Sequence, residues 1–563
     1  MNRRTLLAPV VAVVIGALVA SPASAAVVPD PISVTADGAA FTLAPLGSYE
    51  TGTFDASAQE IVAAHRGRLF TVNAALGEVE VLDARAAAAP TRIGRISAVG
   101  VGAADGSTVP DGAVANSVAV RADGLGLIAV ESAVKTDPGW LVLFDASRLR
   151  VLGAVRVGAQ PDMVTFAADG RTVVVANEGE PSDDYSVDPE GSVAVVSLSS
   201  RLRAVRQDAV RIADFHGFED ALPEGVRVFG PTVDAAFPVS ANLEPEYIAV
   251  SGRTAYVTLQ ENNAIAVVDL RTAKVTDLWP LGFKDYGVTG LDPSDKDSVI
   301  DIRTVPGLRG LYQPDSIAAY TARGHTYLVT ANEGDAREWG DYEEGVRVKS
   351  LGKKGVPPIC ADSPLAAMTA DEQLGRLNVS TASGLSADGS CFENLYTFGT
   401  RSFSVWEDGR LVFDSGDAFE QITAEAMPEF FNSNHSGSNL EGRSDDKGPE
   451  PEGVAVGTVG GRTYAFIGLE RVGGLMAYDI TRPATSSFVS YVNNRDFSQS
   501  VEDGGSLALA GDLGAEGVTF IAAKDSPTRA PLVAVANEVS GTTTLFELDG
   551  LSGRGGSGRP CPR

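Results

Sequence analysis

The sequence predicts an all-β fold, a seven-bladed β-propeller whose last blade is closed by the N-terminal strand. Three observations support this prediction. One strand–turn–strand pattern recurs along the chain with a repeat of roughly 40 to 50 residues, the length of a propeller blade. The repeats are rich in valine and contain no helical stretches. The last repeat lacks a strand that has a counterpart before the first repeat.

Each repeat follows one plan, in which a carboxylate or amide precedes a short apolar strand, a turn, a second apolar strand ending near glutamate, and a third strand. The first two strands of the successive repeats lie within residues 59–74, 115–132, 161–178, 245–261, 314–333, 451–470 and 515–538. The third strands lie within residues 79–84, 140–146, 192–198, 264–270, 396–406, 474–480 and 543–548. Short strands separated by turns are typical of WD40/YVTN-like propellers.

A fourth strand precedes the next repeat, as VLGAVRVGA at 151–159 does before the third. The seventh repeat has no fourth strand, because the chain beyond Leu548 is rich in glycine and proline. The segment FTLAPLGSYETG at 41–52 stands in the matching place before the first repeat. We expect it to complete the last blade, which removes the open sheet edges that favour aggregation. Residues 41–548 then form the propeller, and two separate domains are the alternative.

Both ends of the chain are expected to lie outside the propeller. Residues 1–26 combine Arg3 and Arg4 with an apolar run and a small-residue cleavage pattern, which predicts a signal peptide. The run is short for the alternative, a transmembrane anchor, and the paired arginines leave twin-arginine export open. Residues 549–563 are predicted to be a flexible tail. We therefore expect a secreted, extracellular monomer without a membrane span in the mature chain.

The net charge narrows the classes of possible binding partner. The 563 residues are 44% hydrophobic and carry a formal net charge of −28, which argues against nucleic acids and anionic membranes as partners and favours cations.

In an oxidising compartment Cys360 and Cys391 are expected to form a disulfide around a polar segment. Cys561 is left over in the tail.

Acidic residues recur at the same two positions of the repeats. In a blade the first strand crosses the disc and the second returns, so the start of one lies beside the end of the other. Because the innermost strands line the central channel, these carboxylates are expected to converge on one mouth. The predicted metal ligands are Glu60, Asp162, Glu178, Glu246, Glu261, Asp315, Glu333, Glu452, Glu470, Glu516 and Glu538. Glu131 also occupies one of the repeated positions. At two others the acid is replaced by asparagine, Asn73 and Asn116.

Calcium is the cofactor that this arrangement favours. Like charges a few ångströms apart raise one another's pKa and destabilise the compact state, and Ca²⁺ relieves this by taking six to eight oxygen ligands. The alternative is structural, since Asp and Glu at strand ends also accept backbone N–H groups or pair with arginine.

Long loops gather on the same face as these acids. They span residues 179–191, 214–243, 284–312, 335–394 and 418–449. Such a face is typical of ligand binding, and we expect a small anionic or other extracellular ligand there. One loop carries Asp292, Asp295, Asp297 and Asp301 at short spacing, a second possible metal site that lacks the glycine and terminal glutamate of an EF-hand. A solvated acidic turn is the alternative.

Another loop, EGRSDDKGPEPEG at 441–453, runs into the acid Glu452. Its Arg443 and Lys447 could hold an anion such as phosphate against a bound cation. With His435 in the preceding loop segment, they are the candidate catalytic residues; an internal salt-bridge network is the plainer alternative.

Several of these segments resemble a known family. They are ANEGE at 176–180, ANEGDARE at 331–338, LDPSDKD at 291–297 and RSDDKGPEPEGV at 443–454. The chain resembles bacterial choice-of-anchor I proteins and the related mesenchyme-specific cell surface glycoprotein. This resemblance implies a secreted or surface-attached seven-bladed propeller, and some members carry an alkaline phosphatase label.

Two functions are compatible with the sequence. The first is a secreted, calcium-binding propeller that acts as an extracellular binding or surface-interaction module. It is favoured because no nucleophile elbow, zinc-protease motif or phosphate-binding loop occurs. The alternative is a calcium-dependent phosphoesterase of the alkaline phosphatase or phytase kind, in which the cation polarises phosphate and activates water.

Overall fold

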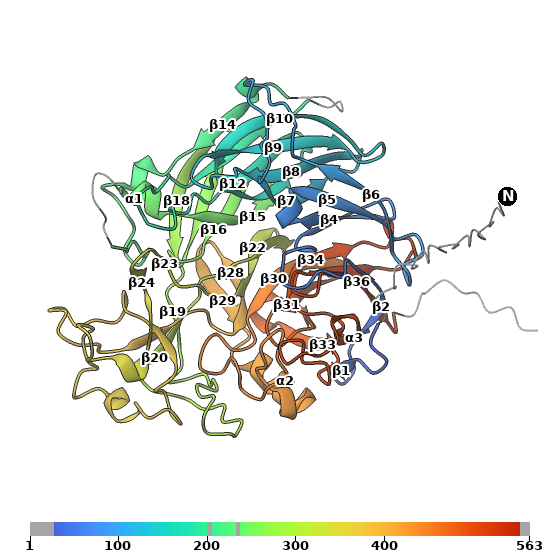
Figure 1. Ribbon diagram of the computed structural model, residues 1–563. Coiled ribbons are helices and arrows are strands. Elements are labelled where there is room, and N and C mark those ends of the chain that lie inside the picture. The colour runs from blue at the N-terminus through green and yellow to red at the C-terminus, as the bar shows by residue number, and fades with distance from the viewer. Residues whose placement is uncertain (1–26, 200–204, 232, 234–236, 552–563) are drawn as a thin grey trace, which may run out of the picture.

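The computed structural model describes residues 27–199, 205–231, 233 and 237–551. The predicted signal peptide at 1–26, and residues 552–563 of the predicted tail with Cys561, lie outside the described residues. The regular structure of the described chain is mainly β-strand, and most strands belong to four-stranded antiparallel sheets arranged around a common centre (Figure 1). Among these residues, no helix is both long enough and apolar enough to cross a membrane.

The first four sheets contain consecutive strands in chain order. They are formed by β3 (Val62–His65), β4 (Arg68–Asn73), β5 (Glu78–Asp83) and β6 (Thr91–Ser97); β7 (Val114–Val120), β8 (Leu125–Glu131), β9 (Pro138–Asp145) and β10 (Arg150–Ala159); β11 (Pro161–Phe166), β12 (Thr172–Asn177), β13 (Ser192–Ser197) and β14 (Val210–Ala213); and β15 (Pro245–Ser251), β16 (Thr254–Leu259), β17 (Ala264–Asp269) and β18 (Lys274–Pro280).

The next sheets take in strands from distant parts of the chain. They are formed by β21 (Ile317–Ala322), β22 (His325–Asn332), β28 (Ser402–Glu407) and β29 (Arg410–Asp414); β30 (Pro451–Val459), β31 (Arg462–Leu469), β32 (Leu475–Asp479), β33 (Ser487–Asn493) and β1 (Ile32–Thr35); and β34 (Ala515–Ile521), β35 (Leu532–Asn537), β36 (Thr542–Asp549) and β2 (Thr42–Glu50). The segment predicted to complete the last sheet supplies its outermost strand, because β2 pairs antiparallel with β36 from Thr42 opposite Asp549 to Glu50 opposite Thr542. The fifth strand β1, which adds to the edge strand β33, was not predicted.

The first strand of each sheet packs beside the first strands of its neighbours. β7 contacts β3 and β11, β15 contacts β11 and β21, β30 contacts β21 and β34, and β34 contacts β3. The hydrophobic core lies between the faces of adjacent sheets, where Val174, Val195 and Val257 are fully buried. Strands covered on both faces need apolar side chains at successive positions, which explains the valine-rich repeats. The architecture is a propeller fold.

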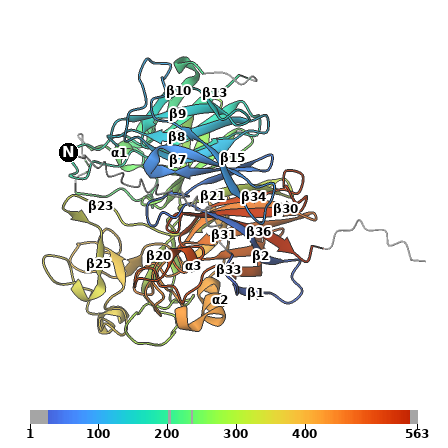
Figure 2. The ribbon, with the colours of Figure 1, turned by 45° about the vertical axis from the view of Figure 1, so that its right-hand side comes forward.

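The longest insertions fold into a lobe of their own rather than remaining open loops. Its sheets are formed by β19 (Phe283–Asp285), β20 (Leu308–Leu311) and β27 (Leu395–Thr397), and by β25 (Gly345–Arg347) and β26 (Asn378–Ser380). The short hairpin of β23 (Glu338–Trp339) and β24 (Tyr342–Glu343) comes from the same insertion, and its Trp339 ring contacts Lys135 of a large-sheet loop. Leu308, Val379 and Phe392 belong to a separate fully buried apolar cluster. Figures 1 and 2 both show β20 in a lobe beside the larger sheets.

Helices are short and lie between strands. The α-helices are α1 (Val239–Asn242), α2 (Ala418–Ala426) and α3 (Leu507–Ala510). The 3₁₀ helices are η1 (Ala74–Leu76), η2 (Gln207–Ala209), η3 (His216–Phe218), η4 (Val348–Ser350), η5 (Pro364–Ala367), η6 (Pro428–Phe430) and η7 (Pro483–Thr485). The helix α2 lies in the insertion that leads to the RSDDKG segment.

The predicted disulfide is present in the lobe and joins Cys360 to Cys391 across 31 positions. Replacing both cysteines by alanine should destabilise the lobe by about 3 kcal/mol, because the unfolded segment regains the freedom of the open loop. Calorimetry with and without dithiothreitol measures the effect. The reductant should lower the melting temperature of the wild type and leave the double variant unchanged; equal melting temperatures for the oxidised wild type and the variant would contradict a stabilising role.

Candidate metal centre

Many of the repeated acids line a single cavity at one mouth of the central channel. The cavity has a volume of about 160 Å³. The predicted ligands in its wall are Glu60, Asp162, Glu178, Glu246, Glu261, Asp315 and Glu516. Glu180, Asp335, Asn116 and Gln260 add further oxygen-bearing side chains. The structure therefore brings carboxylates from distant repeats together, as the strand geometry predicts.

Bulges at the strand starts present the acids to this cavity. The pairing register shifts between Pro161 and Val164, between Pro245 and Ile248, and in the equivalent places of β30 and β34. Each shift contains the acid of its repeat, and a bulge leaves its extra residue unpaired and redirects the side chain. The proline beside the acid suits this place, because proline has no N–H to donate to the ladder.

In three repeats the residue before the proline has a left-handed backbone conformation. Gln160, Gln313 and Glu450 have φ angles of 45°, 38° and 50°. The amide of Gln160 donates to Glu178 Oε2 at 2.7 Å, and its Oε1 accepts the backbone N–H of Glu180 at 3.0 Å. Non-glycine residues in this region are strained, and local bonds of this kind hold them there. The strained glutamine therefore orients the carboxylate at the end of the neighbouring strand.

Several carboxylate oxygens in the mouth have no hydrogen-bond partner among the described residues. Glu246 is only 6% exposed, and both of its oxygens are without a partner. Glu261 is 8% exposed and has one such oxygen, Oε2. One oxygen each of Glu60, Asp315, Glu452 and Glu516 is in the same situation. Buried polar atoms normally find partners, so these oxygens are suited to bind a cation or water.

The same carboxyl groups resist ionisation. Burial, and after it the neighbouring carboxylates, raise the pKa of Asp162, Glu261 and Glu538 to about 7. Burial raises the pKa of Glu246 well above its ordinary value, with Glu261 and Glu178 as the strongest neighbouring charges. These directions are what mutual repulsion in a buried site produces.

The opposite side of the mouth carries its own positive charges. Lys447 Nζ lies 2.5 Å from Glu333 Oε1 and 3.1 Å from Glu450 Oε2. Arg471 Nε lies 2.9 Å from Glu470 Oε2 and 3.2 Å from Glu450 Oε2. Although burial acts to raise the pKa of Glu450, Lys447 and the arginines lower it well below its ordinary value.

Three predicted ligands on this side approach one another closely. One oxygen each of Glu333, Glu452 and Glu470 lies within 4.8 Å of the others, and no other set of three potential ligands meets this criterion among the described residues. The triad has the spacing of a cation site. Two of its members, Glu333 and Glu470, already carry ion pairs.

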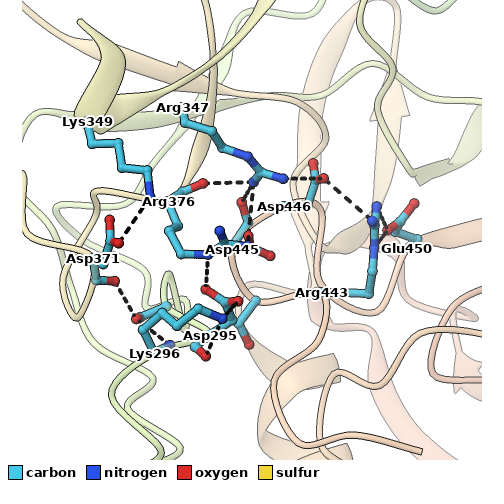
Figure 3. Close-up of polar contacts among 12 residues, drawn as sticks. Asp295, Lys296, Arg347, Lys349, Asp371, Arg376, Arg443, Asp445, Asp446 and Glu450 are labelled. Atoms are coloured by element: carbon cyan, nitrogen blue, oxygen red, sulfur yellow. Dashed lines mark hydrogen bonds and ion pairs between the residues drawn. The ribbon is translucent and has the colours of Figure 1, made fainter. Parts of the chain in front are cut away.

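The candidate catalytic residues belong to an internal ion-pair network. Arg443 pairs with Glu450 at 2.6 Å and with Asp446 at 3.5 Å, and Asp446 also pairs with Arg347, as Figure 3 shows. His435 Nδ1 lies 3.2 Å from Glu470 Oε1. With Lys447, these groups have protein partners for their charges, which is the arrangement of the salt-bridge alternative. The phosphoesterase hypothesis stays a prediction.

The four aspartates of the second predicted metal loop have separate partners. Asp295 pairs with Arg376 at 2.6 Å and with Lys296 (Figure 3), and Asp301 pairs with Arg303 at 3.4 Å. Asp292 is fully buried and accepts the backbone N–H groups of Ser294 and Asp301. Asp297 caps a turn at the backbone of Val299. The described structure does not bring three of these aspartates into one close ligand group.

Sequence reasoning missed two acids of the mouth, Glu180 and Asp335. Each lies two positions after a predicted ligand, Glu178 or Glu333, and ends the repeated motif ANEGE or ANEGD. The repetition of an acid at that position was the signal that could have identified them.

The model of the choice-of-anchor I domain matches residues 60–483. The chain belongs to the choice-of-anchor I family. This membership confirms the resemblance seen in the RSDDKGPEPEGV segment.

Two relatives of this choice-of-anchor I protein share about a third of their aligned residues with it. Gigasin-3a of Magallana gigas is 33% identical over 193 residues, 32% of this chain and 66% of that protein. The mesenchyme-specific cell surface glycoprotein of Strongylocentrotus purpuratus is 33% identical over 274 residues, 43% of this chain and 35% of that protein. The chain thus matches about two thirds of the first relative and about a third of the second.

Two solved structures are also similar to the choice-of-anchor I chain. Hydrazine synthase of Kuenenia stuttgartiensis has a TM-score of 0.42 at 14% identity and covers 89% of this chain and 99% of its own. The Cps50 (Swd1) β-propeller domain of Myceliophteria thermophila has a TM-score of 0.38 at 9% identity, with 89% and 99% covered.

Proposed function

We propose that this protein is a secreted, calcium-binding seven-bladed propeller that serves as an extracellular binding module. In this proposal the seven large sheets are the blades, and β2 closes the last one. The observation that carries the calcium site is Glu246, whose two oxygens are buried at the mouth without a partner among the described residues. It lies among the carboxylates of Glu261, Glu178 and Asp315.

Calcium suits this site better than the other common divalent cations. The mouth offers carboxylates and the amide oxygens of Asn116 and Gln260, and contains no thiolate or imidazole in its wall. Hard oxygen donors of this kind select Ca²⁺ or Mg²⁺ over zinc. A ring with many oxygen donors accommodates the six to eight ligands of Ca²⁺, whereas Mg²⁺ demands a small octahedron and retains water.

An extracellular setting is supported by two independent features. A disulfide such as Cys360–Cys391 persists in oxidising compartments. One relative is a cell surface glycoprotein. The loop-rich face beside the mouth is where this proposal places the extracellular partner, with bound calcium available to attract a small anionic ligand.

Calorimetric titration of metal-free protein with CaCl₂ tests the proposal. We expect binding heat and a rise in melting temperature, since a ligand at 100 times its Kd stabilises the folded state by about 2.7 kcal/mol. Replacing Glu246 by glutamine should weaken calcium binding at least tenfold, because a charged ligand is removed from the centre of the site. The matched control is Glu425→Gln, which removes the same charge from an exposed position of α2.

The comparison with MgCl₂ addresses selectivity. Calcium should bind more tightly than magnesium to the wild type. Absence of both binding heat and thermal stabilisation in folded wild-type protein would reject the calcium site, and equal affinities of Glu246→Gln and the wild type would place the ion elsewhere.

A further inference from the structure

The two sides of the acidic mouth differ in how their charge is balanced. Asp162, Glu178 and Glu246 form no ion pair within the described part of the chain, although all three line the cavity. Across the mouth, Glu333 and Glu470 contact Lys447 and Arg471 directly. A divalent cation is therefore attracted more strongly to the first side than to the second.

We propose that Lys447 is a built-in counterion that keeps a second divalent cation out of the triad Glu333, Glu452 and Glu470. The bound cation of the proposed function is thereby confined to the side of Asp162, Glu178 and Glu246. This inference rests on the proposed calcium site, whose ion it locates.

The geometry of the triad is the first argument. Its three carboxylate oxygens already lie within 4.8 Å of one another, close enough to share one ion. Glu452 Oε2 has no hydrogen-bond partner among the described residues, so the triad retains an available donor atom. What separates this triad from an ordinary cation site is the positive charge beside it, that of Lys447 at Glu333 and that of Arg471 at Glu470.

The contacts of Lys447 are the second argument. Its Nζ lies 2.5 Å from Glu333 Oε1, 3.1 Å from Glu450 Oε2 and 2.7 Å from the carbonyl oxygen of Gly334. These three oxygens use all three N–H donors of an ammonium group. The lysine side chain is 11% exposed, so little solvent screens its charge. A divalent ion bound to Glu333 would lie within a few ångströms of this fixed positive charge.

The balance of charge supports the same conclusion. Four carboxylates, those of the triad and Glu450, face three cations, Lys447, Arg443 and Arg471. Removing Lys447 leaves Glu450 paired with both arginines and frees an oxygen of Glu333. The change therefore makes the net charge of this group one unit more negative, and Glu450 keeps its two arginine partners.

The position of Lys447 is also fixed by the loop that carries it. Arg401 donates to the carbonyl oxygens of Ser444 and Asp446 at 2.8 and 2.7 Å, immediately before the lysine. A lysine on a loop held in this way loses less backbone entropy in forming these pairs than one on a mobile loop. The ammonium thus remains at the triad rather than exchanging with solvent cations.

The variant Lys447→Gln tests this role. We expect calorimetric titration with CaCl₂ to find about one additional equivalent of calcium per chain in the variant, since the triad then acts as a carboxylate site. Lys349→Gln is the matched control, because it removes the same charge from the ion pair with Asp371 in the lobe. Its stoichiometry should equal that of the wild type. Circular dichroism and the melting temperature establish that each variant is folded.

Combining Lys447→Gln with Glu452→Gln places the additional ion. The extra equivalent should disappear in this double variant, and the ion bound by the wild type should remain. Conversely, Glu246→Gln should impair only the ion that the wild type binds.

The possible outcomes separate this inference from the proposed function. An unchanged stoichiometry in folded Lys447→Gln overturns the counterion role, even where the wild type binds calcium. No binding to the wild type but binding to Lys447→Gln rejects the proposed function and supports the counterion. Binding to neither protein rejects both, and an ion at the triad of the wild type, revealed by its loss in Glu452→Gln alone, contradicts the inference.

Discussion

Metal-free protein is expected to lose stability as the pH rises from about 5 to about 8, and calcium should remove most of this loss. The carboxyl groups of the mouth are responsible. The pKa of Asp162 rises from its ordinary 3.8 to about 7, and those of Glu261 and Glu538 rise from 4.5 to about 7. Burial is the largest cause in each case.

The direction in which stability changes with pH depends on whether the folded or the unfolded state binds protons more tightly. The folded-state pKa of these acids lies above the unfolded value. Their contribution to the free energy of unfolding is therefore fully present below about pH 4 and is lost as the pH rises through about 7. One pKa unit corresponds to about 1.4 kcal/mol, so the combined loss is several kcal/mol. Calcium replaces the proton as the counter-charge and is bound best by the ionised form.

Urea unfolding at pH 5, 6, 7 and 8 measures this effect in metal-free and calcium-loaded protein. The free energy of unfolding should decline with pH in the first series and much less in the second. Glu246→Gln should flatten the decline, because it removes one of the mutually repelling carboxyl groups. A metal-free protein that becomes more stable from pH 5 to 8 would refute this account of the mouth.

Arg401→Ala should destabilise the protein by about 3 to 5 kcal/mol, because it leaves a buried carboxylate without its partner. The side chains of Arg401 and Glu420 are 2% and 1% exposed and meet at 2.7 Å. Arg401 also donates to the carbonyl oxygens of Asp292, Ser444 and Asp446. One side chain therefore connects α2, the loop at 292 and the RSDDKG segment.

Two further variants isolate the contribution of the buried pair. Arg148→Ala breaks a pair with Asp145 in which the arginine is 72% exposed, and should change stability by less than about 1 kcal/mol. The double variant Arg401→Met/Glu420→Leu should be more stable than Arg401→Ala, because no unpaired charge is left buried. Chemical unfolding compares the three, and a double variant less stable than Arg401→Ala would show that the carbonyl bonds, not the charges, dominate.

Features that repeat or depend on local pattern could be predicted from the sequence. The valine-rich strand pairs mark the sheets, the strand ends place Glu60, Asp162 and Glu246 at one cavity, and the cysteine spacing indicates the disulfide. These inferences need only the periodicity of strands and their reversal at turns.

Features that depend on contacts between distant loops could not be predicted from the sequence. Lys447 meets Glu333 across 114 positions, and Arg376 meets Asp295 across 81. No local signal distinguishes an aspartate bound to arginine from one free to bind a metal. The second core of the lobe was missed for a similar reason, since its apolar residues are dispersed over segments without a repeat. Ion-pair partners therefore decide which acidic motif remains available, and they are set by tertiary packing.

The pairing of β2 with β36 has a consequence for how the protein is made. The partners Thr42 and Asp549 stand near opposite ends of the described chain. A ribosome must therefore synthesise residues 42–549 before this sheet can form, and the nascent chain meanwhile exposes unpaired edges. A translation product that stops before β36 would leave the outer edge of this sheet unpaired, and an unpaired strand edge favours aggregation.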